Sequence, residues 1–75
     1  MLLVDLRQSD QHISRFIGEQ CAQFGNVVSV KVVRSAVTYA LVQMAHELQT
    51  LEVAGRFGES VFGVAAVIHL EQMPA

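Results

Sequence analysis

The segment Thr38–Met44, with the sequence TYALVQM, alternates between two kinds of side chain and constrains the fold strongly. Alternate residues of a β-strand point to opposite faces of a sheet. One row is small and apolar, as a core requires, and comprises Ala40, Val42 and Met44. The opposite row comprises Tyr39, Leu41 and Gln43. We therefore predict a strand with one buried face and one face that is available for other contacts.

Length and composition indicate a single small folded domain. The chain has 75 residues, of which 52% are hydrophobic and 16% are charged. This composition is typical of a packed globular domain and not of a disordered segment. We expect one domain over residues 1–75, with a core over 2–70 and a short tail at 71–75. A domain of this size buries only roughly 60% of its unfolded surface, so we expect modest stability.

Cysteine content, hydropathy and charge exclude several classes of protein. The single cysteine, Cys21, excludes an internal disulfide and a multi-cysteine zinc site, and it fits the reducing cytoplasm. No apolar run approaches the ~20 residues that cross a bilayer, so we expect no membrane partner. The formal net charge is −2, with five Lys and Arg residues, which gives little general attraction for nucleic-acid phosphates.

The first third of the chain has the pattern of a strand followed by a helix. Residues 1–6 alternate as a strand, whose inner face comprises Leu2, Val4 and Leu6. Ser9 or Asp10 can then cap a helix over Gln11–Phe24. The apolar residues of this helix fall three or four positions apart and predict one buried stripe. The stripe comprises Ile13, Phe16, Ile17, Cys21 and Phe24.

The rest of the chain predicts two strands in a hairpin, a helix and a last strand. The β-branched run Val27–Val33 is joined to Thr38–Met44 by a tight connection at residues 34–36. A second helix of about ten to twelve residues follows, because apolar residues recur along it. They are Leu48, Leu51, Ala54 and Phe57, with Gly55 and Gly58 marking its end. The last strand is Val61–Leu70. We place Phe62, Val64, Ala66, Ile68 and Leu70 on one of its faces and Ala65, Val67 and His69 on the other.

The order strand-helix-strand-strand-helix-strand predicts an α+β fold. We expect a ferredoxin-like two-layer sandwich, βαββαβ, with a four-stranded antiparallel sheet and two helices on one face. Many domains with different functions share this arrangement, so the fold alone does not define the function.

Three segments resemble the RNA recognition motif (RRM) family over roughly residues 2 to 70. The run FGNVVSVKV at residues 24–32 is similar to the junction between the first helix and second strand of RRMs. In Thr38–Met44, Tyr39, Ala40 and Val42 match the aromatic octamer of the family, while Leu41 and Met44 replace aromatics. Near the N-terminus, Leu2 and Val4 fit core positions of the hexamer, and Leu3 stands where an aromatic is usual.

The resemblance implies single-stranded RNA as the partner, bound on the uncovered face of the sheet. RRMs stack bases on aromatic side chains of this face. The residues that we assign to RNA binding are Tyr39, Leu41, Leu3, Lys31, Gln43 and Arg34. Tyr39 would stack a base, and Lys31 and Arg34 would contact phosphates. The same face is expected to hold Ser29, Val33, Val67 and His69.

A protein partner or a homodimer is the alternative, because the same face carries an apolar patch of the kind that marks protein contacts. The patch comprises Leu3, Val33, Leu41 and Val67. We expect no enzyme activity, no cofactor and no metal. His12, His46 and His69 fall on separate elements without metal-ligand spacing, and Cys21 lies on the apolar stripe of a helix, as a buried inert thiol does.

Overall fold

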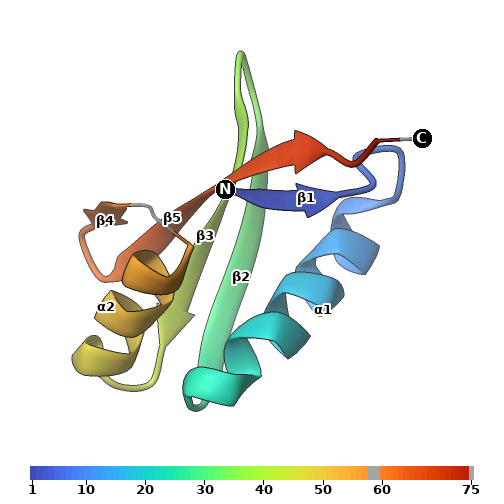
Figure 1. The fold of residues 1–75 in the computed structure, drawn as a ribbon. Helices are drawn as coiled ribbons and strands as arrows, with labels where there is room; N and C mark the ends of the chain where they lie inside the picture. The colour runs from blue at the N-terminus through green and yellow to red at the C-terminus, as the bar shows by residue number, and fades with distance from the viewer. Residues whose placement is uncertain (58–59, 75) are drawn as a thin grey trace.

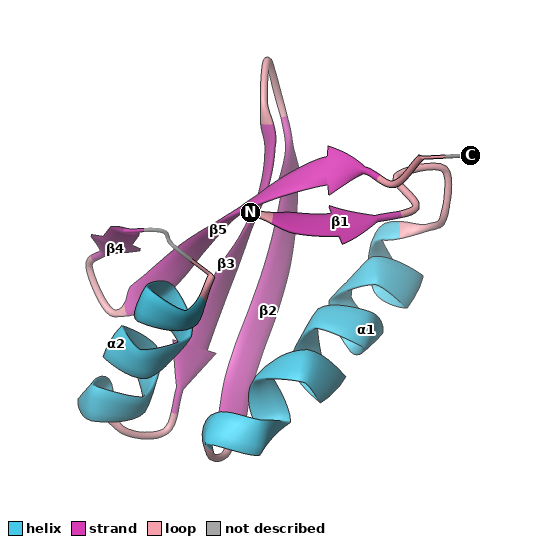
Figure 2. Ribbon diagram, in the orientation of Figure 1, coloured by secondary structure: helices cyan, strands magenta, loops and turns pink. Residues whose placement is uncertain are grey.

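The computed structural model describes residues 1–57 and 60–74 (Figure 1). In chain order, the elements are β1 (Leu2–Val4), α1 (Asp10–Cys21), the short 3-10 helix η1 (Ala22–Phe24), β2 (Val27–Arg34), β3 (Thr38–Met44), α2 (Glu47–Arg56), β4 (Ser60–Phe62) and β5 (Ala65–Gln72). The fold is α+β, as predicted, with α1 and α2 packed on one face of the sheet (Figure 2). The bounds of β3 are those expected from the sequence.

The sheet differs from the predicted one in its strand number and direction. Over the described residues it has five strands in the order β1-β5-β3-β2, and β4 also pairs with β5. The β1–β5 pair is parallel and the other pairs are antiparallel, so the expected four-stranded antiparallel sheet is wrong. β5 occupies an inner position because its side chains are largely apolar on both faces. The strand β1 has only three residues and lies at an edge of the sheet. A short edge strand leaves few backbone N–H and C=O groups unpaired.

The predicted single strand Val61–Leu70 is divided by a two-residue turn. Phe62 and Ala65 are paired across this turn, and Gly63 has a φ of 62°. A positive φ at the first position of a hairpin loop favours glycine, which explains why the chain reverses here. Directly opposed residues share a sheet face, so Phe62 lies on the face of Ala65 and not on that of Ala66. The face expected for Phe62 was therefore wrong.

The end of β5 also extends beyond the prediction. Glu71 and Gln72 pair with Leu3 and Val4, and the Met73 amide donates to the Val4 carbonyl at 2.9 Å. Residues 71–72 are thus part of the sheet and not of a tail. Gly58, expected to mark the end of α2, and Ala75, the last residue of the predicted tail, lie outside the described residues.

The helix α1 is capped by Ser9, whose Oγ accepts a hydrogen bond from the His12 amide at 3.1 Å. Its buried side chains are Ile13, Ile17 and Cys21. Phe16 is 37% exposed, so its predicted place in the core is wrong. Because Phe16 directly precedes Ile17, it lies about 100° around the helix from that residue, at the edge of the apolar stripe. Phe24 is partly buried against the same core.

The helix α2 buries a different face from the one predicted. Leu48 and Leu51 are 75% and 48% exposed. Residues three apart drift by about 60° at each step around a helix with 3.6 residues per turn, so an unbroken spacing of three does not stay on one face. The face that packs inward comprises Thr50, Val53 and Ala54, with Phe57 partly buried. Thr50 is compatible with the core because its Oγ1 accepts a hydrogen bond from the Met44 amide at 3.1 Å.

The core lies between the two helices and the inner face of the sheet. Its strand residues are Val4, Ala40, Val42, Met44, Ala66, Ile68 and Leu70. They belong to β1, β3 and β5, and each has the orientation that the alternating pattern predicts. Neither α1 nor α2 is long and apolar enough to cross a membrane, and the described residues include no other helix that is.

Candidate nucleic-acid interface

The outer face of the sheet, turned away from α1 and α2, brings most of the predicted RNA-binding residues together. Cross-strand pairing arranges this outer face in rows. One row is Val33, Tyr39 and His69, and the next is Lys31, Leu41 and Val67. Ser29 and Gln43 form a third pair. Tyr39, Leu41, Lys31 and Gln43 therefore share one surface, as expected from alternation along β2 and β3.

Tyr39 and His69 are direct neighbours on this face. They occupy the same register position on β3 and β5, where side chains on one face have Cβ atoms roughly 4.5–5.5 Å apart. Both are partly exposed. Sequence reasoning placed His69 on this face but did not assign it to RNA binding. Its position beside Tyr39 depends on β5 being next to β3, which is not a local property of the sequence.

Phe62 adds a third ring to the outer face, at the end of β4 next to the turn into β5. Its side chain is 75% exposed and lies on the face of Ala65, Val67 and His69. Sequence reasoning missed this residue because the Gly63 turn was not recognised. A glycine between two apolar runs is a signal that can identify such a hairpin.

Leu3 lies on the edge of the sheet and away from Tyr39. It is 45% exposed and is paired with Glu71 of β5, so β5 separates it from β3. The side chain paired with Tyr39 on β5 is that of His69.

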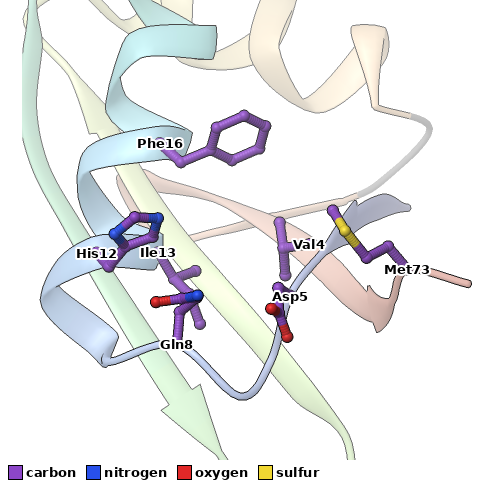
Figure 3. A pocket seen from close by; sticks show the side chains of 7 residues that line it. All are labelled: Val4, Asp5, Gln8, His12, Ile13, Phe16 and Met73. Atoms are coloured by element: carbon purple, nitrogen blue, oxygen red, sulfur yellow. The ribbon is translucent and has the colours of Figure 1, made fainter. Parts of the chain in front are cut away.

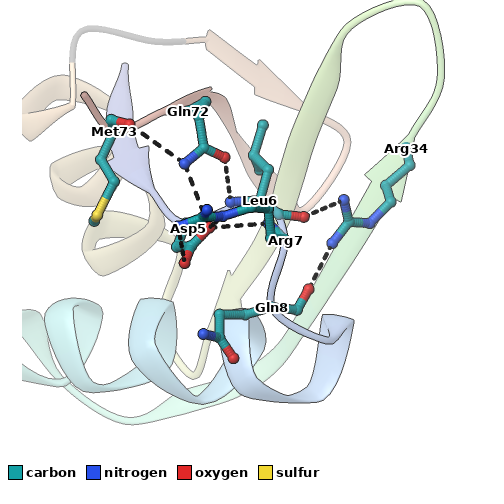
Figure 4. A network of polar contacts seen from close by, with 7 residues as sticks. All are labelled: Asp5, Leu6, Arg7, Gln8, Arg34, Gln72 and Met73. Carbon is teal, nitrogen blue, oxygen red and sulfur yellow. Dashed lines mark hydrogen bonds and ion pairs between the residues drawn. The ribbon is translucent and has the colours of Figure 1, made fainter. Parts of the chain in front are cut away.

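Arg34 is engaged within the protein, as Figure 4 shows for its contacts with the loop after β1. Its Nε donates to Asp10 Oδ1 at 2.7 Å, and its two terminal nitrogens donate to the carbonyls of Leu6 and Gln8 at 2.8 and 3.0 Å. The guanidinium therefore connects the end of β2 to the loop between β1 and α1. By contrast, Lys31 is exposed and, among the described residues, has no ion-pair partner.

A second polar cluster fixes the end of the β1–β5 pair (Figure 4). Gln72 accepts a hydrogen bond from the Leu6 amide at 2.8 Å through Oε1 and donates to Asp5 through Nε2 at 3.3 Å. Asp5 also accepts from Arg7 Nε at 2.9 Å and from the Arg7 amide at 3.1 Å. These hydrogen bonds from Arg7 hold the pKa of Asp5 well below its usual range.

A small cavity of about 130 Å³ lies between β1 and α1 (Figure 3). The ring of Phe16 and the side chain of Met73 form parts of its wall, with Val4 between them, and His12 lies at the helix side. Its volume is below the roughly 300 Å³ at which ligand pockets begin. We assign no ligand to it. It explains why Phe16 remains partly exposed although it faces apolar neighbours.

The described residues contain no cluster of three or more His, Cys, Asp or Glu side chains that could hold a metal ion. Cys21 is fully buried, and this burial raises the pKa of its thiol to about 11. The thiol is therefore protonated at neutral pH and is a poor nucleophile.

Comparison of the chain with protein-family models, with curated proteins and with solved structures gave no match.

Proposed function

We propose that this domain binds single-stranded RNA on the outer face of its sheet. The observation that carries the proposal is the cross-strand pair of Tyr39 and His69 on that face. Rings side by side on an uncovered sheet are suited to unstacked bases, which single-stranded RNA presents and duplex RNA does not. Lys31 lies one row away and supplies a cation, while Gln43 supplies an amide for a base edge.

The proposed affinity is low. Stacking contributes ~1–3 kcal/mol per base, so Tyr39 and His69 together contribute roughly 2–6 kcal/mol. A Kd of 1 μM corresponds to about −8.2 kcal/mol, so the domain alone is expected to bind more weakly than this. Among the described residues of the outer face, Lys31 is the cation without an ion-pair partner, so we expect it to neutralise one phosphate. The logarithm of the binding constant should then fall with the logarithm of the salt concentration with a slope of about −0.7.

A protein partner or a second copy of the chain is the other candidate, because the rows also form an apolar patch. Val33, Leu41 and Val67 lie in adjoining positions on β2, β3 and β5. All are partly exposed. Apolar side chains that adjoin on an uncovered sheet commonly mark protein contacts. RNA is the first candidate because the apolar patch is complete without Tyr39 and His69. A protein interface therefore does not account for these two rings, whereas base stacking does. A non-enzymatic role in the cytoplasm is part of this proposal.

An amide chemical-shift titration with a mixed-sequence short RNA tests the proposal. We expect shifts at Tyr39, His69 and Lys31, and little change along α1, which lies on the other face. Sedimentation at increasing concentration tests the alternative. Concentration-dependent association that Leu41→Asp abolishes, without RNA-induced shifts, would favour the protein interface and contradict RNA binding.

A further inference from the structure

A second cavity, of about 340 Å³, lies between the end of β3, the first turns of α2 and the β4–β5 turn. This volume is within the range of roughly 300–1,000 Å³ that is typical of ligand pockets. Met44 and Leu51 line it from β3 and α2, and Val61 and Val64 line it from the hairpin. Apolar side chains thus line the cavity from two sides, and they can contact the two faces of a flat ring.

Two polar side chains in the cavity lining have no partner in the described part of the chain. They are Gln43, at the end of β3, and Glu47, in the first turn of α2. Thr50 also lines the cavity, but its hydroxyl already accepts the hydrogen bond from the Met44 amide. An amide and a carboxylate are therefore available beside the apolar side chains of the cavity.

The cavity adjoins the proposed RNA-binding face. Gln43 belongs to the cavity lining and also to the outer face, four residues along β3 from Tyr39. Four residues of a strand span roughly 13 Å, a distance that a few nucleotides can cover. Phe62 stands between Val61 and Gly63, both of which line the cavity. A strand of RNA that leaves Tyr39 can thus reach the cavity without leaving the surface.

We propose that this cavity binds one base of the same RNA strand, and that the base is guanine. This inference rests on the proposed function. The Glu47 carboxylate accepts hydrogen bonds, and guanine alone among the four bases offers two adjacent N–H donors on its Watson–Crick edge, at N1 and N2. The amide of Gln43 supplies a donor for the neighbouring O6 acceptor. A carboxylate repels phosphate, so the charge at the cavity selects a base and not the backbone.

The four ribonucleoside 5′-monophosphates are suitable probes, because each reports on the cavity without requiring the outer face. We expect guanosine monophosphate to shift the amide signals of Glu47, Leu51 and Val64, and the other three to do so more weakly. Glu47→Gln weakens guanosine monophosphate binding by roughly tenfold to a hundredfold, the range for loss of a bidentate base contact.

Two matched controls lie on the same helix. Glu52 and Leu48 are exposed on α2 and do not line the cavity. Glu52→Gln should leave binding unchanged where Glu47→Gln weakens it, and Leu48→Ser should be neutral where Leu51→Ser weakens it.

Equal responses to all four nucleotides, or an unchanged affinity in Glu47→Gln, would overturn the guanine assignment. RNA-induced shifts on the outer face with no nucleotide response at the cavity would overturn this inference and leave the proposed function intact. A nucleotide response at the cavity with no RNA-induced shift at Tyr39 or His69 would contradict the proposed function instead.

Discussion

The side chain of Gln49 on α2 occupies the space beside Gly25 that a Cβ atom at position 25 would need. Gly25 also has a φ of 143°, in the region that favours glycine. The turn between η1 and β2 thus packs closely against the second helix.

Gly25→Ala should lower the free energy of unfolding by roughly 1–3 kcal/mol, because alanine is strained at this φ and the end of the Gln49 side chain must move aside. Gly55→Ala is the matched control, since a Cβ at position 55 meets no atom within 4 Å and lies on a helix. That change should stabilise the domain by roughly 0.5–1 kcal/mol. Urea unfolding of both variants measures the effects. Equal stability of Gly25→Ala and the parent would show that neither the backbone conformation nor Gln49 restricts position 25.

The buried face of α1 can be tested by comparing two neighbouring residues. Ile17 is fully buried, whereas Phe16 is partly exposed. Ile17→Ala should cost roughly 2–5 kcal/mol, a large part of the stability of so small a domain, and Ile17→Val roughly 0.5–1.5 kcal/mol. Phe16→Ala should cost less than Ile17→Ala, although it removes more atoms. Thermal unfolding gives the order, and a larger loss in Phe16→Ala would contradict the packing described for α1.

Arg34 and Lys31 should separate a structural cation from a ligand-binding one. Arg34→Ala removes the contacts with Asp10, Leu6 and Gln8 and should cost about 1 kcal/mol, since the ion pair is largely exposed. Lys31→Ala should leave stability unchanged but reduce the salt slope of RNA binding by about 0.7. Melting curves and salt titrations of binding measure the two effects. Arg15→Ala, on the exposed side of α1, controls for loss of charge. A change of salt slope in Arg34→Ala at unchanged stability would reverse these assignments.

Asp5 should make the domain sensitive to acid. Because hydrogen bonds from Arg7 depress its pKa in the folded state, its contribution to stability is present above its ordinary pKa of 3.8. That contribution is lost as the pH falls from that region toward the lower, folded-state pKa. Asp5→Asn should therefore lower the melting temperature at pH 7 and have a smaller effect near pH 3. Glu19→Gln, on an exposed carboxylate of α1, serves as the control. An equal effect of Asp5→Asn at both pH values would exclude this linkage.

Local patterns predicted much of the fold correctly. The alternation in Thr38–Met44 identified the inner and outer residues of β3, and the apolar spacing identified Ile13, Ile17 and Cys21 as buried on α1. Both depend on periodicities that adjacent residues define. The turn at Gly63 is also a local feature, and the glycine between two apolar runs could have predicted it.

Other features depend on contacts between distant segments and were not predictable in this way. The parallel pairing of β1 with β5 joins the two ends of the chain, and it determines that His69 and not Leu3 stands beside Tyr39. The engagement of Arg34 by the loop after β1 likewise joins residues 24 to 28 positions apart. The sequence shows that Arg34 and Lys31 are cations. Only the fold shows that Arg34 is hydrogen-bonded within the protein, whereas Lys31 is exposed.

The affinity of Tyr39→Ala for a mixed-sequence short RNA tests the central claim most directly. Loss of the ring should weaken binding by roughly 1–3 kcal/mol, or about fivefold to 150-fold, while Tyr39→Phe should change it little, because the ring face stacks and the hydroxyl does not. Phe16→Ala removes a partly exposed ring from α1 and should not affect the RNA affinity. Leu41→Phe should tighten binding, because it adds a ring to the outer face. If Tyr39→Ala binds RNA as tightly as the parent and Leu41→Phe gains nothing, the outer face is not an RNA-binding surface.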